Sequence, residues 1–219
     1  MFVQGTVFDP SSAATADGAT ATLNFGRANE ALVSELHGKY FQQCYRGNVY
    51  VASTAVGGVV VPISTTLTPT YSIWNPLGSG KLCVPIVTLI GWSATTAALG
   101  TYGWTYTNNT GSAISATAPF VAFGSGTAIN CNVGSGKVSQ IRTASGGTTT
   151  LVAASTWFRT TGITTLATTV ATTTAPMWMA RDDWDGTCIL PPGNAIHFMG
   201  STAILTTMTI SLVYAELPL

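Results

Sequence analysis

From residue 39 onward the sequence consists of short β-favouring runs separated by turn residues, and this pattern limits the fold more than any other feature. The clearest run spans residues 207–214, where alternate positions carry Met208, Ile210, Leu212 and Tyr214. Strict alternation is typical of a strand with one buried face. The separating segments contain Gly, Pro and Asn, as in Asn75-Pro76-Leu77-Gly78 and Pro191-Pro192-Gly193-Asn194. We therefore expect an all-β protein of about eight to ten antiparallel strands.

Two other runs indicate how such strands are buried. Residues 82–90 are apolar at both alternating sets of positions, which predicts a central strand covered on both sides. Pro85 interrupts this run and cannot donate a ladder hydrogen bond, so we expect a bulge or an edge position there. Residues 101–106 place their three aromatic side chains on one face of a strand.

Eight antiparallel strands in two sheets form a jelly roll, and we predict an antiparallel jelly-roll β-sandwich. Another sandwich topology remains an alternative, because periodicity does not determine strand order.

The N-terminal part has a different character. Residues 1–24 are small and polar with no period that would bury a face, which favours an extended arm. Residues 27–38 carry apolar side chains at helical spacing and end at Gly38, which predicts one short helix. We expect residues 1–38 to form the arm and helix, and residues 39–219 to form the jelly-roll domain. The apolar points of the arm are candidate partner-binding residues: Phe2, Val3, Val7 and Phe8.

The composition favours contact with other proteins. Only 7% of the residues are charged, against about 25% in an ordinary soluble domain, and threonine occurs 37 times. Threonine favours extended backbone, and lysine and glutamate, which are depleted at interface cores, are scarce. A secreted or low-complexity surface that is merely rich in threonine is the alternative interpretation.

The same composition argues against two classes of partner. The longest apolar run, residues 82–92, contains Pro85 and Thr88, whereas a membrane-spanning helix needs about 20 apolar residues. The first residues lack the features of a signal peptide, so we expect a protein made in the cytoplasm and not bound to a membrane. The formal net charge is zero, which gives no general attraction to nucleic acid.

Two Gly-Ser-Gly-Lys segments, residues 78–81 and 134–137, resemble phosphate-binding loops only superficially. Leu82 and Val138 stand where the loop needs Ser or Thr, and the first glycine of the pattern is absent. We interpret both segments as turns.

No constellation of catalytic residues is evident. Asp182, Asp183 and Asp185 form an acidic group that we interpret as a polar loop between strands, although a calcium site shared between subunits stays open. His37 suits a helix C-terminus, and His197 alternates with apolar neighbours and is expected to face outward. We expect no enzymatic activity.

Four cysteines are spread along the chain without a C-x-x-C pair: Cys44, Cys83, Cys131 and Cys188. Buried free thiols are the simplest interpretation, and two disulfides or a metal site remain alternatives. We expect no cofactor.

Several segments together resemble virion structural proteins of tailed bacteriophages. These segments are residues 35–50, the turn Asn75-Pro76-Leu77-Gly78-Ser79-Gly80-Lys81, and the closing strand that ends in Tyr214-Ala215-Glu216-Leu217-Pro218. The resemblance covers residues 35–92 and 188–219. It implies a jelly-roll protein in the virion, of the capsid decoration (cement) type and often homotrimeric. The implied partners are further copies of the chain and the major capsid protein or other virion proteins, with synthesis in the host cytoplasm.

Two other functions compete with capsid decoration. A tail, baseplate or fibre component would bind host carbohydrate through exposed aromatic side chains, for which Trp104, Trp178 and Trp184 are candidates. A cell-wall hydrolase is the third hypothesis, and it lacks an evident acid–base pair.

Overall fold

The computed structural model describes residues 38–92, 100–107, 120–146, 149–164, 179–202 and 207–219. The chain divides into two compact units, residues 1–42 and 43–219, and the fold below is that of the second unit. The described ranges contain one short helix, α1 (Phe41–Tyr45), and strands only otherwise. The strands are β1 (Val49–Ser53), β2 (Val59–Val60), β3 (Tyr71–Trp74), β4 (Lys81–Trp92), β5 (Gly100–Thr107), β6 (Phe120–Ala122), β7 (Ala128–Asn130), β8 (Arg142–Ser145), β9 (Thr150–Leu151), β10 (Thr156–Thr164), β11 (Met179–Asp183), β12 (Ala195–Gly200) and β13 (Thr207–Pro218).

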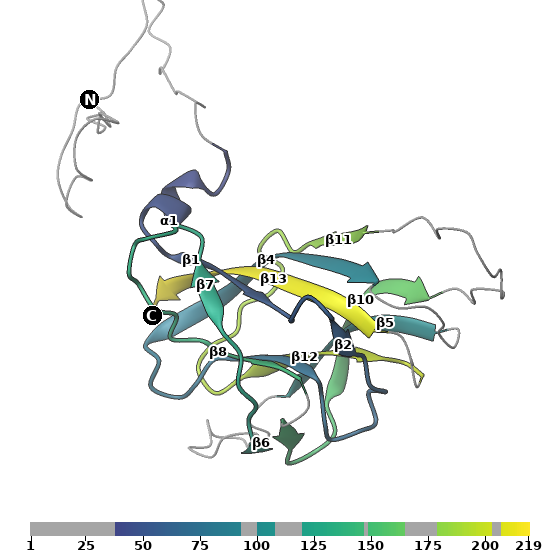
Figure 1. Cartoon of the computed structure of the whole chain (residues 1–219). Helices are drawn as coiled ribbons and strands as arrows, with labels where there is room; N and C mark the ends of the chain where they lie inside the picture. The colour runs from purple at the N-terminus through teal and green to yellow at the C-terminus, as the bar shows by residue number, and fades with distance from the viewer. Residues whose placement is uncertain (1–37, 93–99, 108–119, 147–148, 165–178, 203–206) are drawn as a thin grey trace, which may run out of the picture. The chain divides into compact units, whose positions relative to one another are not determined.

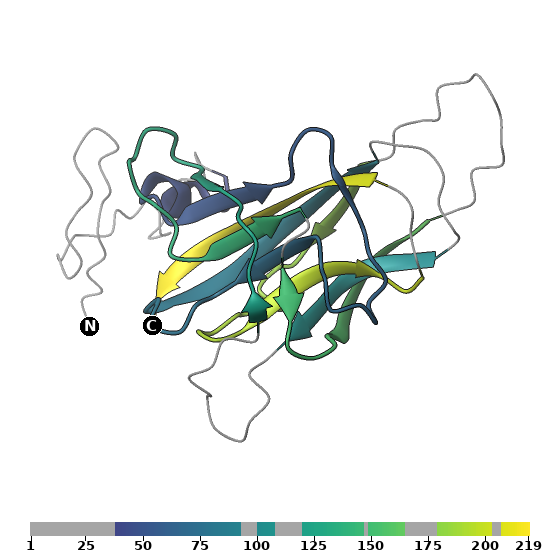
Figure 2. The ribbon, with the colours of Figure 1, turned by 60° about the horizontal axis from the view of Figure 1, so that its bottom comes forward.

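Two antiparallel sheets pack face to face (Figure 1). The first sheet has the order β11-β4-β13-β1-β7, with β2 pairing to β13. The second sheet has the order β10-β5-β12-β3-β8, and β6 and β9 form a separate two-stranded sheet. The second sheet comes forward in Figure 2.

The strand pairing is nested along the chain. β1 pairs with β13, β3 with β12, β4 with β11 and β5 with β10, always antiparallel. The first and third of these pairs lie in the first sheet, and the other two lie in the second sheet. This is the arrangement of a long hairpin rolled into two sheets, so the predicted jelly-roll β-sandwich is confirmed.

The segment between β5 and β10 extends both sheets at their opposite edge. β7 pairs with β1, and β8 pairs with β3, although the segment starts and ends at the edge formed by β5 and β10. The strands of this segment are short, with two to four residues each.

The core lies between the sheets and follows the alternation of the strands. On β13 the inward side chains Met208, Ile210, Leu212 and Tyr214 have no exposed surface, as the sequence predicts. Tyr102 and Trp104 of β5 are buried against Phe198 of β12, with ring centroids 5.8 Å and 5.3 Å from that of Phe198. The aromatic face predicted for residues 101–106 therefore forms part of the core.

The structure corrects one prediction about β4 and confirms another. Its inward residues are buried, but outward residues such as Val87 and Leu89 are only half-buried, so burial on both sides is wrong for the chain alone. Val213 pairs with Val87 and Tyr214 pairs with Pro85, which leaves Ile86 unpaired as a β-bulge. The bulge next to Pro85 is the solution that the sequence predicts.

The predicted turns are also confirmed. Gly78 and Gly80 have φ of 81° and 64°, and strand β4 begins directly at Lys81. Gly134 and Gly136 have φ of 94° and 69°. Such positive φ values favour glycine, and neither segment leads into a helix of the kind a phosphate loop needs.

The predicted arm and the predicted helix at residues 27–38 lie outside the described residues, apart from Gly38. The helix that is described, α1, lies in a stretch for which the sequence predicts strands and turns, so that prediction is wrong for residues 41–45. No helix among the described residues has the length and apolar character needed to cross a membrane.

Candidate functional site

The predicted partner-binding residues of the arm, Phe2, Val3, Val7 and Phe8, lie outside the described part of the chain, as does His37. The other candidate residues lie in the described part of the chain. They are the histidine, the acidic segment, two tryptophans and the cysteines, followed by one pocket and one sheet surface.

His197 faces away from the core, as the sequence predicts, because its side chain lies on the side of β12 opposite to the core residues Ile196 and Phe198. It is nevertheless completely buried. Ser72 Oγ lies 2.8 Å from its Nδ1 and Thr107 Oγ1 lies 2.9 Å from its Nε2.

The surroundings of this histidine keep its side chain neutral. Burial without a charged partner lowers the pKa of His197 to about 3. The ring of Phe120, from the segment that contains β6, lies over it with centroids 5.8 Å apart.

The Ser72–His197 contact resembles the pair used in nucleophilic catalysis but lacks what that chemistry needs. Both residues have no exposed surface, and a Thr hydroxyl occupies the place of the carboxylate that would orient the imidazole. An imidazole with a pKa near 3 is also a weak base. The pair therefore serves to satisfy buried polar groups. Sequence reasoning missed it because the two residues are 125 positions apart.

The acidic segment forms part of the edge of the sandwich. Asp182 and Asp183 belong to β11, so the predicted loop is wrong for these two residues, and Asp185 lies in the following turn with a φ of 43°. Asp182 forms a bidentate ion pair with Arg159 of β10, with N–O distances of 2.8 Å and 2.6 Å. The guanidinium group of Arg159 also lies 4.9 Å from the ring centroid of Trp184.

This ion pair has a structural role. β10 and β11 are the edge strands of different sheets, so the contact ties the two sheets together at one edge. The hydrogen bond from Arg159 to Asp182 raises the pKa of the guanidinium group. Within the described ranges no group of three or more His, Cys, Asp or Glu side chains has metal-binding geometry.

Two of the tryptophans proposed for carbohydrate stacking are core residues. Trp104 and Trp184 have no exposed surface and pack against each other with centroids 5.7 Å apart. The expectation that they are exposed is wrong, and Trp178 lies outside the described residues.

The four cysteines are free thiols. Only Cys83 is fully buried, and the other three are half-buried, so the prediction of buried thiols holds fully for one of them. Burial raises the pKa of all four, and it raises that of Cys188 to about 11. These groups are therefore protonated thiols at neutral pH, which makes them poor nucleophiles and poor metal ligands.

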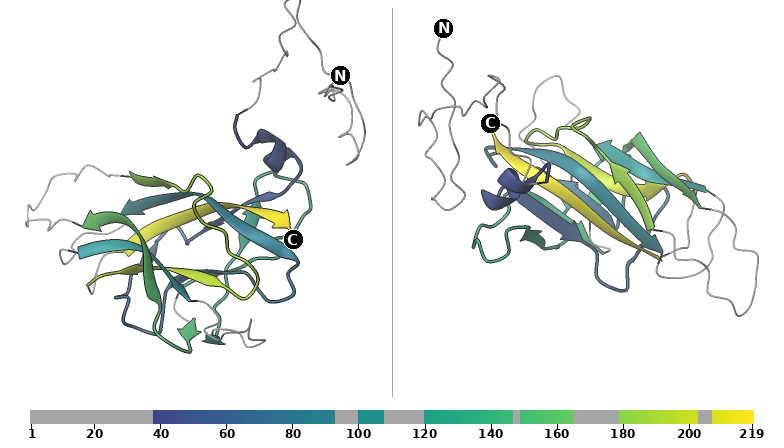
Figure 3. Two further views of the ribbon diagram at one scale, coloured as in Figure 1. Left: turned by 180° about the vertical axis from the view of Figure 1, so that it is seen from behind. Right: turned by 90° about the horizontal axis from the view of Figure 1, so that it is seen from above.

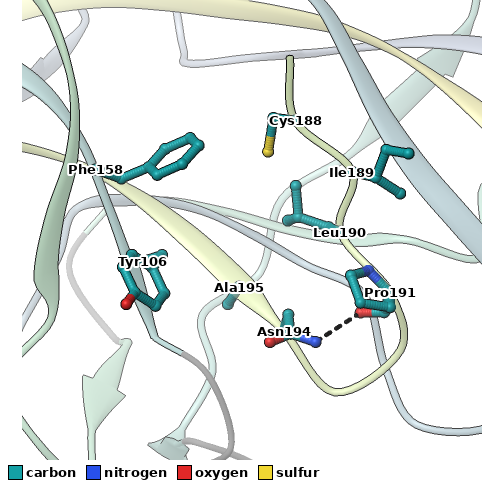
Figure 4. Close-up of a pocket in the computed structure, with 8 residues that line it drawn as sticks. All are labelled: Tyr106, Phe158, Cys188, Ile189, Leu190, Pro191, Asn194 and Ala195. Carbon is teal, nitrogen blue, oxygen red and sulfur yellow. Dashed lines mark hydrogen bonds between the residues drawn. The ribbon is translucent and has the colours of Figure 1, made fainter. Parts of the chain in front are cut away.

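Cys188 lines a shallow apolar pocket of about 280 Å³ (Figure 4). Its walls are mainly the side chains of Tyr106, Phe158, Ile189, Leu190 and Pro191. The only hydrogen bond drawn among the lining residues joins the Asn194 side-chain amide to the Pro191 carbonyl, at 3.2 Å. The lining has no charged group, and nothing in it points to a catalytic role.

The residues of the Asn75 turn and of the closing strand stabilise the fold. The Asn75 side chain donates to the carbonyls of Lys81 and Leu190, both at 2.8 Å, and accepts from the Ser79 hydroxyl at 2.6 Å. Asn75 is completely buried and so fixes the turn before β4.

The closing motif has a similar effect at the other end of the chain. The carboxylate of Glu216 is 4% exposed and accepts hydrogen bonds from the Ser139 hydroxyl and from the backbone N–H groups of Gln140 and Ile141. The Tyr214 hydroxyl lies 2.7 Å from Ser139 Oγ. Strand β13 is thereby tied to the loop between β7 and β8.

The remaining candidate is a surface, the outer face of the first sheet. A row of directly paired residues crosses this sheet: Ile129 on β7, Val51 on β1, Val213 on β13 and Val87 on β4. The adjacent row contains Ser53, Ser211 and Leu89. Ile129 is 60% exposed, and the three valines are half-buried. We call these two rows the outer face.

The outer face contains no charged residue on β1, β4, β7 or β13, because the charged residues of these strands, Lys81 and Glu216, lie outside its two rows. The stretches 49–53, 82–92, 128–130 and 207–215 have no Asp, Glu, Lys or Arg at all. Charges begin at the adjoining edge strand β11, where the exposed Arg181 and Asp183 form an ion pair at 2.9 Å. An apolar centre with a polar rim is the usual anatomy of a protein–protein interface.

Comparison with protein-family models, with curated proteins and with solved structures found no match to this chain. The candidate site rests on its own geometry, which is that of a flat, uncharged surface for contact with protein.

Proposed function

We propose that this chain is a structural protein of a bacteriophage virion, of the capsid decoration (cement) type, and that it has no enzymatic activity. The observation that carries the proposal is the uncharged outer face of the first sheet. Burying aliphatic side chains is favourable, and hydroxyl groups can be covered when they keep a hydrogen-bond partner, so this surface is suited to a lasting contact with protein.

Two further observations support the virion assignment. The jelly-roll topology agrees with what the resemblance to tailed-phage proteins implies. The motif residues Asn75 and Glu216 are buried and fix a turn and the last strand, so the motifs belong to the fold itself.

The carbohydrate-binding alternative loses support, because Trp104 and Trp184 are enclosed in the core. The buried state of the Ser72–His197 pair likewise gives the hydrolase hypothesis no usable nucleophile. The decoration role is therefore the one that we retain.

In this proposal the protein is made in the host cytoplasm and ends in the virion. Its partners are further copies of itself and the major capsid protein or another virion protein, and no nucleic acid, membrane or cofactor takes part. The arm residues Phe2, Val3, Val7 and Phe8 contribute contacts on the neighbouring subunit through extended backbone.

The test is binding to phage heads that lack this protein, measured by co-sedimentation and by the temperature at which the heads release their DNA. We expect the protein to bind and to raise that temperature. Deletion of residues 2–24 should leave a folded protein that binds more weakly. A full-length variant with Phe2, Val3, Val7 and Phe8 all replaced by Ser is the matched control, and it should bind as weakly as the deletion.

Failure of the intact protein to bind any head lattice would contradict the decoration role. An unfolded deletion product, seen by circular dichroism, would show that the arm belongs to the core instead.

A further inference from the structure

The outer face of the first sheet differs from every other sheet surface of the described chain. The inner faces of both sheets are buried in the sandwich core. The outer face of the second sheet is covered by the segment that contains β6, with Phe120 lying over His197. Seen from above in Figure 3 (right), no described strand lies over the outer face of the first sheet, where β13 runs in yellow.

We propose that this outer face binds the same face of a second copy of the chain, related by a two-fold axis. The inference rests on the proposed role in particle assembly and names the partner of that surface. Its central elements are the valines at positions 51, 87 and 213, with Ile129 at the rim.

The charge pattern favours a copy of the same chain as the partner. Two identical faces repel each other when they carry like charges, and the paired positions of this face carry none. At the edge strand β11, Arg181 and Asp183 form an ion pair within one chain, so this rim adds no net charge. A partner with a strongly charged surface would gain nothing here, whereas an identical apolar face is complementary.

The side-chain types suit sheet-on-sheet packing. Paired β-branched residues on neighbouring strands form ridges that interlock with those of a facing sheet about 10 Å away. The Ser53 hydroxyl donates to Ser211 Oγ at 2.8 Å. Covering this row therefore leaves each hydroxyl of the pair with one hydrogen-bond partner, and the Ser211 hydroxyl can still donate to a group of the facing surface.

The size of the face limits the strength of the contact. Four strands spaced about 4.8 Å apart and at most about seven residues of about 3.3 Å rise give a footprint of at most roughly 450 Å² on each copy, since β1 and β7 are shorter. Two copies bury at most about twice that area, which lies below the range of stable complexes and within that of weak, transient ones. We therefore expect a weak pair that forms with rising concentration and is reinforced when copies are held on a common lattice.

A two-fold contact predicts a different number of subunits from the one that the resemblance implies. Face-to-face pairing is isologous and yields dimers, whereas the virion-protein resemblance implies a trimer. The mass of the protein in solution distinguishes the two.

The experiment is sedimentation equilibrium of the full chain at concentrations from about 1 to about 100 μM. We expect a reversible monomer–dimer equilibrium. Val213→Glu, which places a charge at the centre of the face, should raise the dissociation constant at least about tenfold. Ile129→Glu should act in the same direction, and because Ile129 is 60% exposed on the edge strand β7 it does not threaten folding.

The matched control is Val152→Glu. Val152 is 61% exposed and follows β9, which is not part of the first sheet, so this variant should dimerise like the unmodified protein. Circular dichroism and thermal unfolding confirm that all three variants are folded.

Three results would overturn the inference: a monomer throughout the concentration range, a trimer, or a dimer that both face variants leave intact. Each leaves the proposed function open to its own test, because binding to phage heads is measured separately. A Val213→Glu monomer that still binds heads would support the two-fold contact and would show that the outer face does not carry the head contact.

Discussion

The outer faces of the two sheets differ in what covers them. On each sheet, half of the side chains point away from the sandwich core. The second sheet is covered by its own chain, through Phe120 and Phe123, whose rings lie 5.3 Å from that of Trp74. On the first sheet no described strand lies above the row of Val51 and Val213, although Val49 and Ala215, farther along the same side, are buried.

The difference shows in the polar residues that each face tolerates. Under the covered face, Ser72, Thr107 and His197 satisfy one another, since no water reaches them. On the uncovered face the polar residues are Ser and Thr only, whose hydroxyls can meet either water or protein. A face that must serve in both situations is best built from aliphatic side chains and hydroxyls.

The strongest way to break this comparison is to place the same charge on both faces. Thr105 on the covered face and Thr209 on the uncovered face each donate a hydrogen bond to a neighbouring strand's carbonyl. Thr105→Glu buries a carboxylate without a cation and should lower the free energy of unfolding by at least about 3 kcal/mol. Thr209→Glu should cost about 1 kcal/mol or less. Urea denaturation measures both, and equal costs would show that the two faces are covered alike.

The second prediction concerns pH. The unfolded chain binds a proton at His197 below about pH 6.5, while the folded chain does so only near a pKa of about 3. The contribution of the neutral His197 to the free energy of unfolding should therefore be fully present above about pH 6.5. Below that pH the free energy of unfolding should fall by about 1.4 kcal/mol per pH unit, or by roughly 2.7 kcal/mol in total at pH 4.5.

His197→Gln removes this titration and supplies the control. The difference in unfolding free energy between the unmodified protein and this variant should shrink steadily from pH 6.5 to pH 4.5. Parallel stability curves over this range would mean that the histidine is accessible to protons, contrary to a closed cover.

The smallest expected losses of stability come from removing one serine hydroxyl from each of the two outer faces. Ser72→Ala leaves a nitrogen of the buried His197 without its partner and should cost about 1 to 2 kcal/mol. Ser211→Ala breaks the exposed hydrogen bond to Ser53 and should cost about 0.5 kcal/mol or less, because water replaces it. Thermal unfolding at neutral pH checks the order of the two, and a larger loss at Ser211 would reverse the assignment of covered and open faces.

Local sequence predicted the strands well where one rule sufficed. The alternation on β13 and the aromatic face of β5 are confirmed because a period of two directly reports which side chains point inward. The bulge at Pro85 could be predicted because proline lacks a donor. The nested strand pairing could not, since it depends on contacts between segments more than a hundred residues apart, such as β1 and β13.

The errors about exposure have the same origin. The alternation around His197 placed its side chain on the correct side of β12, but its cover comes from residues 120–123, which the local pattern does not connect to it. Trp104 and Trp184 are candidates for stacking on sugars by residue type alone. In the structure the two rings pack against each other inside the core. The outward residues of β4 are apolar because they form part of the outer face. From the sequence alone, this pattern predicts a strand that the chain itself buries on both sides.

The position of β13 has a consequence for how the protein is made. This strand lies between β4 and β1 at the middle of the first sheet, yet it comes after all the other described strands in the chain. Until residue 218 has emerged from the ribosome, β1 and β4 have no strand to pair with between them, and the first sheet cannot close. Folding of this domain must then wait for β13 and proceed slowly, as expected for pairings between distant segments. During that interval the two open strands expose edges to which chaperones or nascent copies of the same chain can attach.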